Sequence, residues 1–144
     1  MTTAQTVFEL AMHLMDEVNE STGKADTADT KEYKNRTVGI LNILRVECYP
    51  YSDTYRITEE DKRPICPEIQ DMETPIGLDD GICQGVLPYG LAARLLLGED
   101  DTKAAFFQQC YEERRAQLAS SIPTAGSDIE DMYGSIEYGQ FGRW

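Results

Sequence analysis

Apolar residues recur every three or four positions in four stretches of the chain, and each stretch predicts a helix. The first stretch runs from Val7 to Val18. Either Thr2 or Thr3 stands where an N-cap is needed, and Gly23 follows the expected end. The beginning of the chain therefore predicts one helix whose apolar side faces a core.

The second stretch predicts a helix that begins near Thr30 and ends before Pro50, because the residue before a proline is disfavoured in the helical conformation. We expect Lys34, Arg45 and Glu47 to face water. The apolar row that should face the core consists of Tyr33, Thr37, Ile40, Leu41, Leu44 and Cys48.

The third stretch, residues 78–97, is apolar on nearly every side, which is typical of a helix at the centre of a bundle. Pro88 either kinks this helix or marks a new helix that begins at Leu87. The residues expected to be buried in this stretch include Leu91, Leu95 and Leu96.

The fourth stretch begins at Asp100 or Asp101, either of which places a carboxylate at the positive end of the helix dipole. It extends to about Ser121, before Pro123. Together the four stretches predict an all-α protein, with a four-helix bundle over residues 1–123 and the third helix in its middle.

Helical periodicity is lost between residues 50 and 77, a Pro-rich, acidic connection between the second and third predicted helices. Residues 54–58 alternate like a short strand and residues 64–69 offer a partner, which is compatible with a small edge β-hairpin. Long loops in compact domains often contact something, so a surface loop and a contact segment both remain open.

Residues 124–144 follow the last predicted helix and combine four glycines with large apolar side chains. When many large apolar side chains are exposed together, they usually mark a contact site. We therefore interpret this segment as an extended C-terminal assembly arm. Its host is the subunit's own bundle, a neighbouring subunit or another protein. The candidate interface residues are Ile129, Met132, Tyr133, Ile136, Tyr138, Phe141 and Trp144.

The chain carries 13 basic and 26 acidic residues, a net charge of −13. Affinity for nucleic acids and for anionic membranes depends on cationic groups, so we expect neither specific DNA binding nor membrane binding. Arg94, Arg114 and Arg115 are expected to pair with carboxylates. The first residues lack the pattern of a secretion signal, so Cys48, Cys66, Cys83 and Cys110 are expected to be reduced and buried.

Few residues are suited to catalysis or metal binding. The single histidine, His13, falls on the polar side of the first helix, one turn from Glu9 and Glu17. The pairs Asp79–Asp80 and Asp100–Asp101 coincide with expected helix starts, where capping explains them. Without a recognised phosphate, zinc or hydrolase motif, we expect no enzyme activity, no cofactor and no metal.

Three runs between residues 64 and 118 follow one another in a distinctive order. An acidic, Pro-rich lead-in, Pro67-Glu-Ile and then Ile76-Gly-Leu-Asp-Asp, precedes Tyr89-Gly-Leu-Ala-Ala-Arg-Leu-Leu-Leu. The third run is Ala105-Phe-Phe-Gln-Gln-Cys-Tyr-Glu-Glu. In this order the runs resemble the small helical head–tail connector proteins of tailed bacteriophages, also called adaptor or head-completion proteins. They form a packing pattern and carry no chemical signature.

The resemblance implies a structural virion protein at the head–tail junction, made in the host cytoplasm. Proteins of this family form rings, commonly twelvefold, that dock under the portal and extend the DNA channel. The partners it implies are further copies of this chain, the portal protein and the next neck or tail protein, while DNA passes without specific binding. A ring of this kind needs a heterologous interface, with a different patch on each side of the subunit.

Other classes of function remain open on the sequence alone. An acidic DNA mimic would need its carboxylates arranged as a continuous track that imitates phosphates. An enzyme would have to use cysteine or carboxylate chemistry without a recognised motif. A different non-enzymatic interaction protein, or a stopper or tail-completion protein, would share the connector's lack of an active site.

Overall fold

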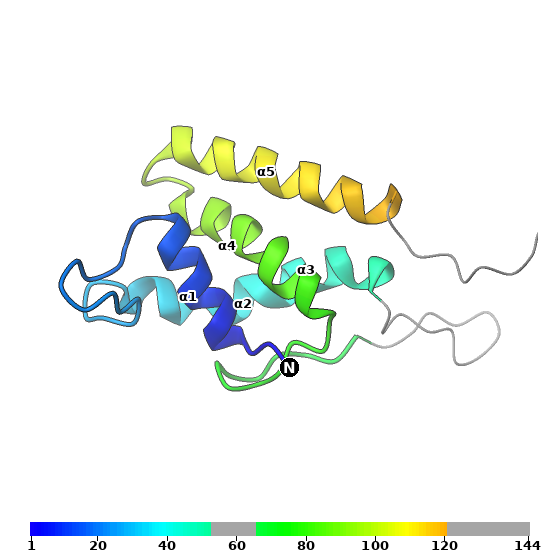
Figure 1. Ribbon diagram of the computed structural model, residues 1–144, viewed down its shortest axis with the longest axis horizontal. Helices are drawn as coiled ribbons and strands as arrows, with labels where there is room; N and C mark the ends of the chain where they lie inside the picture. The colour runs from blue at the N-terminus through cyan, green and yellow to red at the C-terminus, as the bar shows by residue number, and fades with distance from the viewer. Residues whose placement is uncertain (53–65, 121–144) are drawn as a thin grey trace, which may run out of the picture.

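The structure is a computed structural model of the chain, and it describes residues 1–52 and 66–120. These ranges contain five α-helices and one short 3-10 helix, and Figure 1 shows how the α-helices are arranged. They are α1 (Ala4–Leu14), α2 (Lys31–Cys48), η1 (Tyr49–Tyr51), α3 (Asp80–Gly85), α4 (Leu87–Leu96) and α5 (Asp101–Ser120). The described residues contain no strand, and the predicted all-α class is confirmed.

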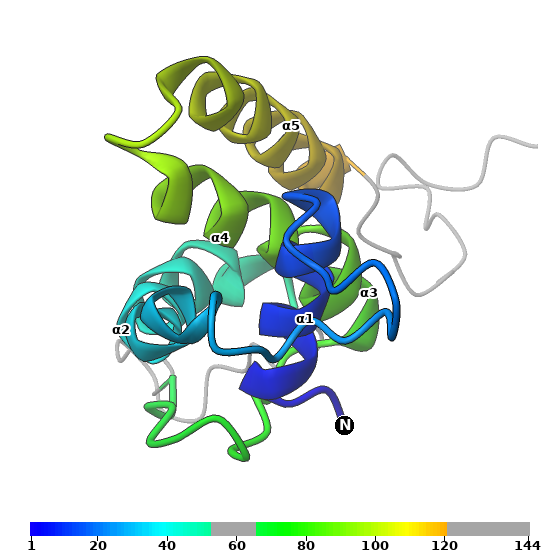
Figure 2. The same cartoon turned by 90° about the vertical axis from the view of Figure 1, so that its left-hand side faces the viewer.

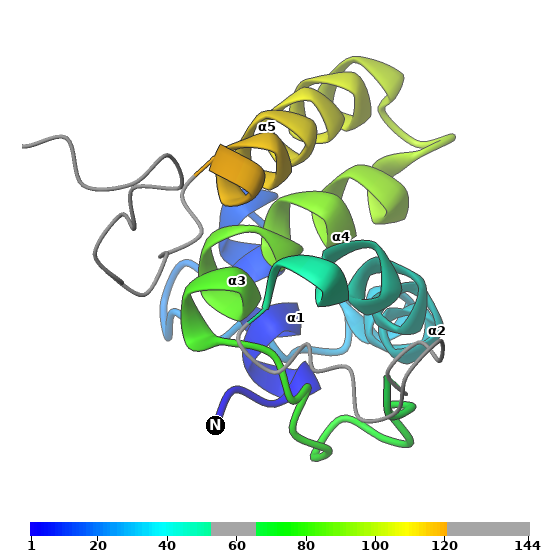
Figure 3. The same ribbon diagram turned by 90° about the vertical axis from the view of Figure 1, so that its right-hand side faces the viewer.

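Helix α4 lies at the centre of the packing, where α1, α2, α3 and α5 all contact it. In Figure 2, α5 covers one side of α4, and α1 and α2 lie on the other. Figure 3 gives the same layering from the opposite direction. Leu91 and Leu95 are fully buried and Leu96 is 6% exposed, which confirms the expected burial of all three.

The third predicted helix is divided into α3 and α4. Val86 separates them with φ −118° and ψ −52°. Pro88 is the second residue of α4. Backbone N–H groups in the first turn have no acceptor within the helix, so a proline there removes no helical hydrogen bond. Of the two sequence-based alternatives, the new helix beginning at Leu87 is confirmed.

Helix α1 ends at Leu14, well before the predicted end near Gly23. Asp16 takes φ +60°, in the left-handed region, and turns the chain out of the helix. The apolar pattern continues to Val18 because that residue packs on the core from the following turn. At the other end Thr3 is the N-cap and its hydroxyl accepts from the Thr6 N–H, as predicted.

Thr30 precedes α2 as expected, but its side chain does not cap the helix. The hydroxyl donates to the Ala25 carbonyl at 2.8 Å and accepts from the Thr27 N–H at 3.0 Å. It therefore holds the preceding turn together, which explains why a side chain at the start of a helix is 1% exposed.

Arg45 was expected to face water and is instead buried, with 7% exposure. Its guanidinium donates to the Asn42 side chain at 2.8 Å and to the Cys66 carbonyl at 2.7 Å. Asn42 in turn exchanges two hydrogen bonds with the backbone of Ile69. These two residues of α2 hold the non-helical stretch after residue 65 against the bundle.

The connection from residue 66 to α3 is irregular and lies against the N-terminal residues. Backbone hydrogen bonds join Gln5 to Met72 and Thr2 to Ile76. The candidate hairpin is not seen in its described part, because residues 66–70 form no strand. Residues 54–58, the other half of that candidate, lie outside the described residues.

Candidate functional site

The seven predicted interface residues fall within 121–144, outside the described residues. Helix α5 ends at Ser120, the last described residue before this segment. The seven residues are Ile129, Met132, Tyr133, Ile136, Tyr138, Phe141 and Trp144.

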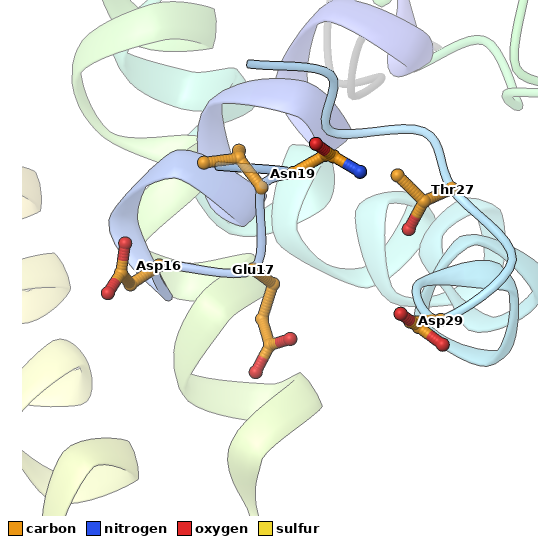
Figure 4. Close-up of a pocket in the computed structure, with 6 residues that line it drawn as sticks. Asp16, Glu17, Asn19, Thr27 and Asp29 are labelled. Atoms are coloured by element: carbon orange, nitrogen blue, oxygen red, sulfur yellow. The ribbon is translucent and has the colours of Figure 1, made fainter. Parts of the chain in front are cut away.

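A small polar pocket of about 120 Å³ lies where the chain turns between α1 and α2. Figure 4 shows the carboxylates of Asp16, Glu17 and Asp29 at its edge, pointing in different directions. The Asn19 side chain is used by its own turn, because it accepts from the N–H groups of Ser21 and Thr22. Across the described ranges, no group of three or more His, Cys, Asp or Glu is placed to hold a metal ion.

The four cysteines are free, as predicted, but only Cys48 and Cys83 are buried. Burial raises the pKa of Cys83 to about 12 and also raises the pKa of Cys48. Thiols with raised pKa values are poor nucleophiles at neutral pH. Cys66 and Cys110 are half-exposed, which corrects the expectation that all four are buried.

A polar cluster joins α2, α4 and α5 around the carboxylate of Glu47. Arg94 from α4 and Arg115 from α5 approach it at 3.1 and 3.4 Å. The hydroxyl of Tyr111, a fully buried residue of α5, donates to the same carboxylate. Glu47 was expected to face water and is instead the half-buried centre of this cluster, while the pairing expected for Arg94 and Arg115 is confirmed.

The protonation states of Glu47 and Tyr111 favour a structural role for this cluster. Burial raises the pKa of Glu47, but the Tyr111 hydrogen bond and the two arginines outweigh it, so its pKa lies below the ordinary 4.5. Burial and the Glu47 contact raise the pKa of Tyr111. The phenol therefore stays protonated and the carboxylate ionised at neutral pH. One donor, Nη1 of Arg94, is buried with no acceptor among the described residues, an arrangement that in general costs about 1–3 kcal/mol.

Among residues 1–52 and 66–120, Arg114 has no carboxylate partner, contrary to expectation. Its guanidinium lies over the ring of Tyr89, 4.3 Å from the centroid, and donates to the Gly85 carbonyl at 3.3 Å. A cation–π contact of this kind contributes about 0.5–1 kcal/mol at an exposed site. Arg114 thus joins α5 to Tyr89 of α4 and to the last residue of α3.

Several large apolar side chains remain exposed on the described surface. Leu97 at the end of α4 is 71% exposed and Phe106 on α5 is 60% exposed. Ile43 and Val46 on α2 are each 57% exposed. Only one of Phe106 and Phe107 can face the core, since neighbours on a helix point about 100° apart, and Phe107 is the buried one.

A groove of about 530 Å³ lies between the end of α4 and the first two turns of α5. Small side chains from both helices lie along it, and Leu97 is its one large apolar residue. The turn beside it is well fixed: Gly98 takes φ +92° and donates to the Asp101 carboxylate at 3.0 Å. The lining residues are Ala93, Arg94, Leu97, Asp101, Ala104, Ala105 and Gln108.

Two side chains of α2 contact residues of α4 at or next to the groove. Arg36 donates to the Leu95 carbonyl at 3.3 Å, and Glu47 pairs with Arg94, which lines the groove. Ile43 lies seven residues after Arg36 and four before Glu47, a spacing that puts all three on one side of a helix. The α4–α5 groove and Ile43 therefore share one face of the protein, which we call the groove face.

Comparisons of the sequence with models of protein families and with curated proteins, and of the fold with solved structures, found no match. The described residues also contain no helix with the length and apolar content of a membrane span. The features that bear on function are the groove face, the charge of the chain and the sequence of the C-terminal segment.

Proposed function

We propose that this protein is a structural subunit of the neck of a tailed bacteriophage, a head–tail connector that forms a ring under the portal. In this role it extends the DNA channel and offers a platform to the next neck or tail protein. The resemblance of residues 64–118 suggests the family, and the all-α fold is compatible with it. One observation carries the proposal: an apolar groove with no occupant among the described residues.

That groove supports an assembly function because exposed apolar surface tends to be a contact site. Leu97 stands 71% exposed beside a floor that includes Ala93 and Ala104, both 4% exposed. A ring built by one repeated contact needs two different surfaces on every subunit. The groove face supplies one such surface, and the apolar C-terminal segment is our candidate for the second.

Charge supports the same proposal. A channel that lets DNA pass should not attract phosphates, and a chain of net charge −13 offers few cations for counterion release. A ring of such chains would repel DNA that strayed towards its wall. The proposal therefore expects the channel wall to guide DNA without holding it.

The DNA-mimic alternative is disfavoured because several carboxylates pair with other groups of the same chain. Glu47 is held inside the fold by Tyr111 and two arginines. Asp80 accepts from both the N–H and the hydroxyl of Thr2, at 3.2 and 2.6 Å. Asp26 is paired with Lys34. Carboxylates committed to internal contacts are poorly placed to imitate a continuous phosphate track.

Electron microscopy of the full-length protein mixed with the portal protein from the same genome tests the proposal. We expect a ring stacked on the portal, together with negligible affinity for duplex DNA at physiological salt. A protein that stays monomeric beside the portal would overturn the connector proposal. If those monomers also inhibited a DNA-binding enzyme, the mimic would be supported instead. Micromolar, salt-sensitive DNA affinity would point to a DNA-handling protein.

A further inference from the structure

We infer that the groove face receives residues 124–144 of a neighbouring copy of this chain, so that each subunit donates its C-terminal segment to the next. This inference rests on the proposed ring and names the contact that closes it. It commits to one of the three hosts that the sequence leaves open for the segment.

The first argument is the position of the groove relative to the end of α5. The groove is lined by Asp101, Ala104, Ala105 and Gln108, in the first two turns of the helix. The C-terminal segment follows Ser120, at the other end of the same helix. Twenty helical residues span about 30 Å. A donor at one end and an acceptor at the other produce head-to-tail association, the geometry from which rings are built.

The second argument is steric fit. The groove's volume of about 530 Å³ lies within the range of about 300–1,000 Å³ typical of binding pockets. Its alanines leave room between the helices, and Leu97 offers apolar surface at the edge. An extended segment with a large apolar residue every two to four positions can place one anchor in the groove and another against Ile43.

The third argument is charge complementarity. Arg36 and Arg94 belong to the groove face, and their side chains are 41% and 27% exposed even though each already pairs with a carboxylate, Glu32 at 3.9 Å and Glu47 at 3.1 Å. In the C-terminal segment carboxylates stand directly beside apolar anchors, as in Asp128-Ile-Glu-Asp and Ile136-Glu-Tyr. Burying the anchors would bring these carboxylates close to the two arginines. Such pairs at the rim favour correct orientation more than they add affinity.

The fourth argument is that the groove is already formed. Tyr33 of α2 donates to Glu99 in the α4–α5 turn at 2.7 Å, and Asp100 caps α5 by accepting from the Lys103 N–H. A site held open in advance costs less ordering on binding than one that must first assemble. The ordering cost then falls on the incoming segment, as in coupled folding and binding.

A pair of matched substitutions tests the groove. Leu97→Asp and Phe106→Asp each replace an exposed apolar side chain with a charge, but only Leu97 lines the groove. We expect Leu97→Asp to weaken self-association on the portal at least about tenfold, while Phe106→Asp assembles like the parent. Both variants should keep the parent's helical spectrum. Equal assembly of the two variants would overturn the inference while leaving a wild-type ring, and with it the proposed function, intact.

Cross-linking between copies tests the occupant. One protein carries Ala105→Cys and another carries Ile136→Cys, both in a Cys66→Ser, Cys110→Ser background that removes the half-exposed native thiols. When the two are mixed and oxidised in the presence of the portal, we expect a disulfide-linked dimer. A chain carrying both cysteines that forms only an internal link would instead assign the segment to its own subunit. A link between copies without any ring would uphold this contact and overturn the connector.

Discussion

The hydroxyl of Tyr111 donates to the carboxylate of Glu47, and this contact joins the outermost helix, α5, to α2 past the central helix α4. Arg94 and Arg115 bind the same carboxylate at 3.1 and 3.4 Å. Three helices thus meet at one charged group, which makes Glu47 a sensitive point for testing how the bundle is held together.

Removing the phenol hydroxyl should destabilise the bundle without changing its fold. We expect Tyr111→Phe to lower the free energy of unfolding by about 1–2 kcal/mol, because Glu47 loses a hydrogen bond to its charged form. Urea denaturation followed by circular dichroism measures the change. Tyr89→Phe is the matched control, since Tyr89 is only half-buried and lies outside the Glu47 cluster. It should differ from the parent by less than about 0.5 kcal/mol.

The same cluster predicts a dependence of stability on pH. Because the pKa of Glu47 in the folded protein lies below the ordinary 4.5, its ionised form favours the folded state. That contribution is present above pH 4.5 and is lost as the pH falls through the folded-state pKa. We expect Glu47→Gln to be less stable than the parent at pH 7, with the gap narrowing in acid. A constant gap between pH 7 and pH 3 would contradict this account.

Gly90 allows α4 to approach both of its neighbours closely. A Cβ at this position would lie 2.9 Å from Leu44 and 2.9 Å from the ring of Tyr111. We expect Gly90→Ala to destabilise the protein by about 1–3 kcal/mol through overpacking. Gly39→Ala is the control on α2: nothing lies within 4 Å of its Cβ, so it should stabilise by about 0.5–1 kcal/mol. Thermal unfolding of both variants shows whether the signs differ.

The central position of α4 predicts a large cost for a cavity there. Leu95 is fully buried, and we expect Leu95→Ala to cost about 2–5 kcal/mol from lost burial and the space left behind. Leu97→Ala, two residues away and 71% exposed, should change stability by less than about 0.5 kcal/mol. An unchanged melting temperature for Leu95→Ala would show that the core lies elsewhere.

A chain that ends at Ala125 tests the role of the C-terminal segment. We expect it to keep a helical spectrum and cooperative melting but to lose assembly on the portal. A full-length variant with serine at Tyr133, Tyr138, Phe141 and Trp144 separates the apolar anchors from chain length and should behave in the same way. Unfolding of the truncated chain would instead make residues 126–144 part of the core.

The sequence was a good guide to where helices lie, because their positions follow from apolar periodicity. It located α2 and α5 to within a residue or two and placed the apolar third stretch at the centre. It was wrong about the end of α1, since a single left-handed residue, Asp16, stops a helix whose apolar pattern continues. Backbone conformation at one residue leaves no periodic signal.

The candidate site was harder to predict, because a groove depends on how helices pack. Leu97 belongs to an apolar run and was grouped with the central helix, yet α4 ends one residue before it. From the sequence, Arg45 is expected to be a polar surface residue. In the structure its guanidinium donates to the carbonyl of Cys66, 21 positions further along the chain. The sequence did contain one indication that part of α5 is exposed. The alanines at 104 and 105 and the adjacent phenylalanines cannot all face the core, because neighbouring residues point to different sides of a helix.

The bonds around Arg45 and η1 have a consequence for protein engineering. The Ser52 N–H donates to the Tyr49 carbonyl of η1 at 3.1 Å, and the Cys66 carbonyl accepts from Arg45 in the last turn of α2 at 2.7 Å, so the residues on both sides of 53–65 are held by hydrogen bonds. When the ends of a segment are already fixed, doubling its length costs only about 0.6 kcal/mol. We therefore expect an epitope inserted between residues 52 and 66 to leave the Arg45 contact with Cys66 in place, which the helical spectrum and melting temperature of such a variant would check.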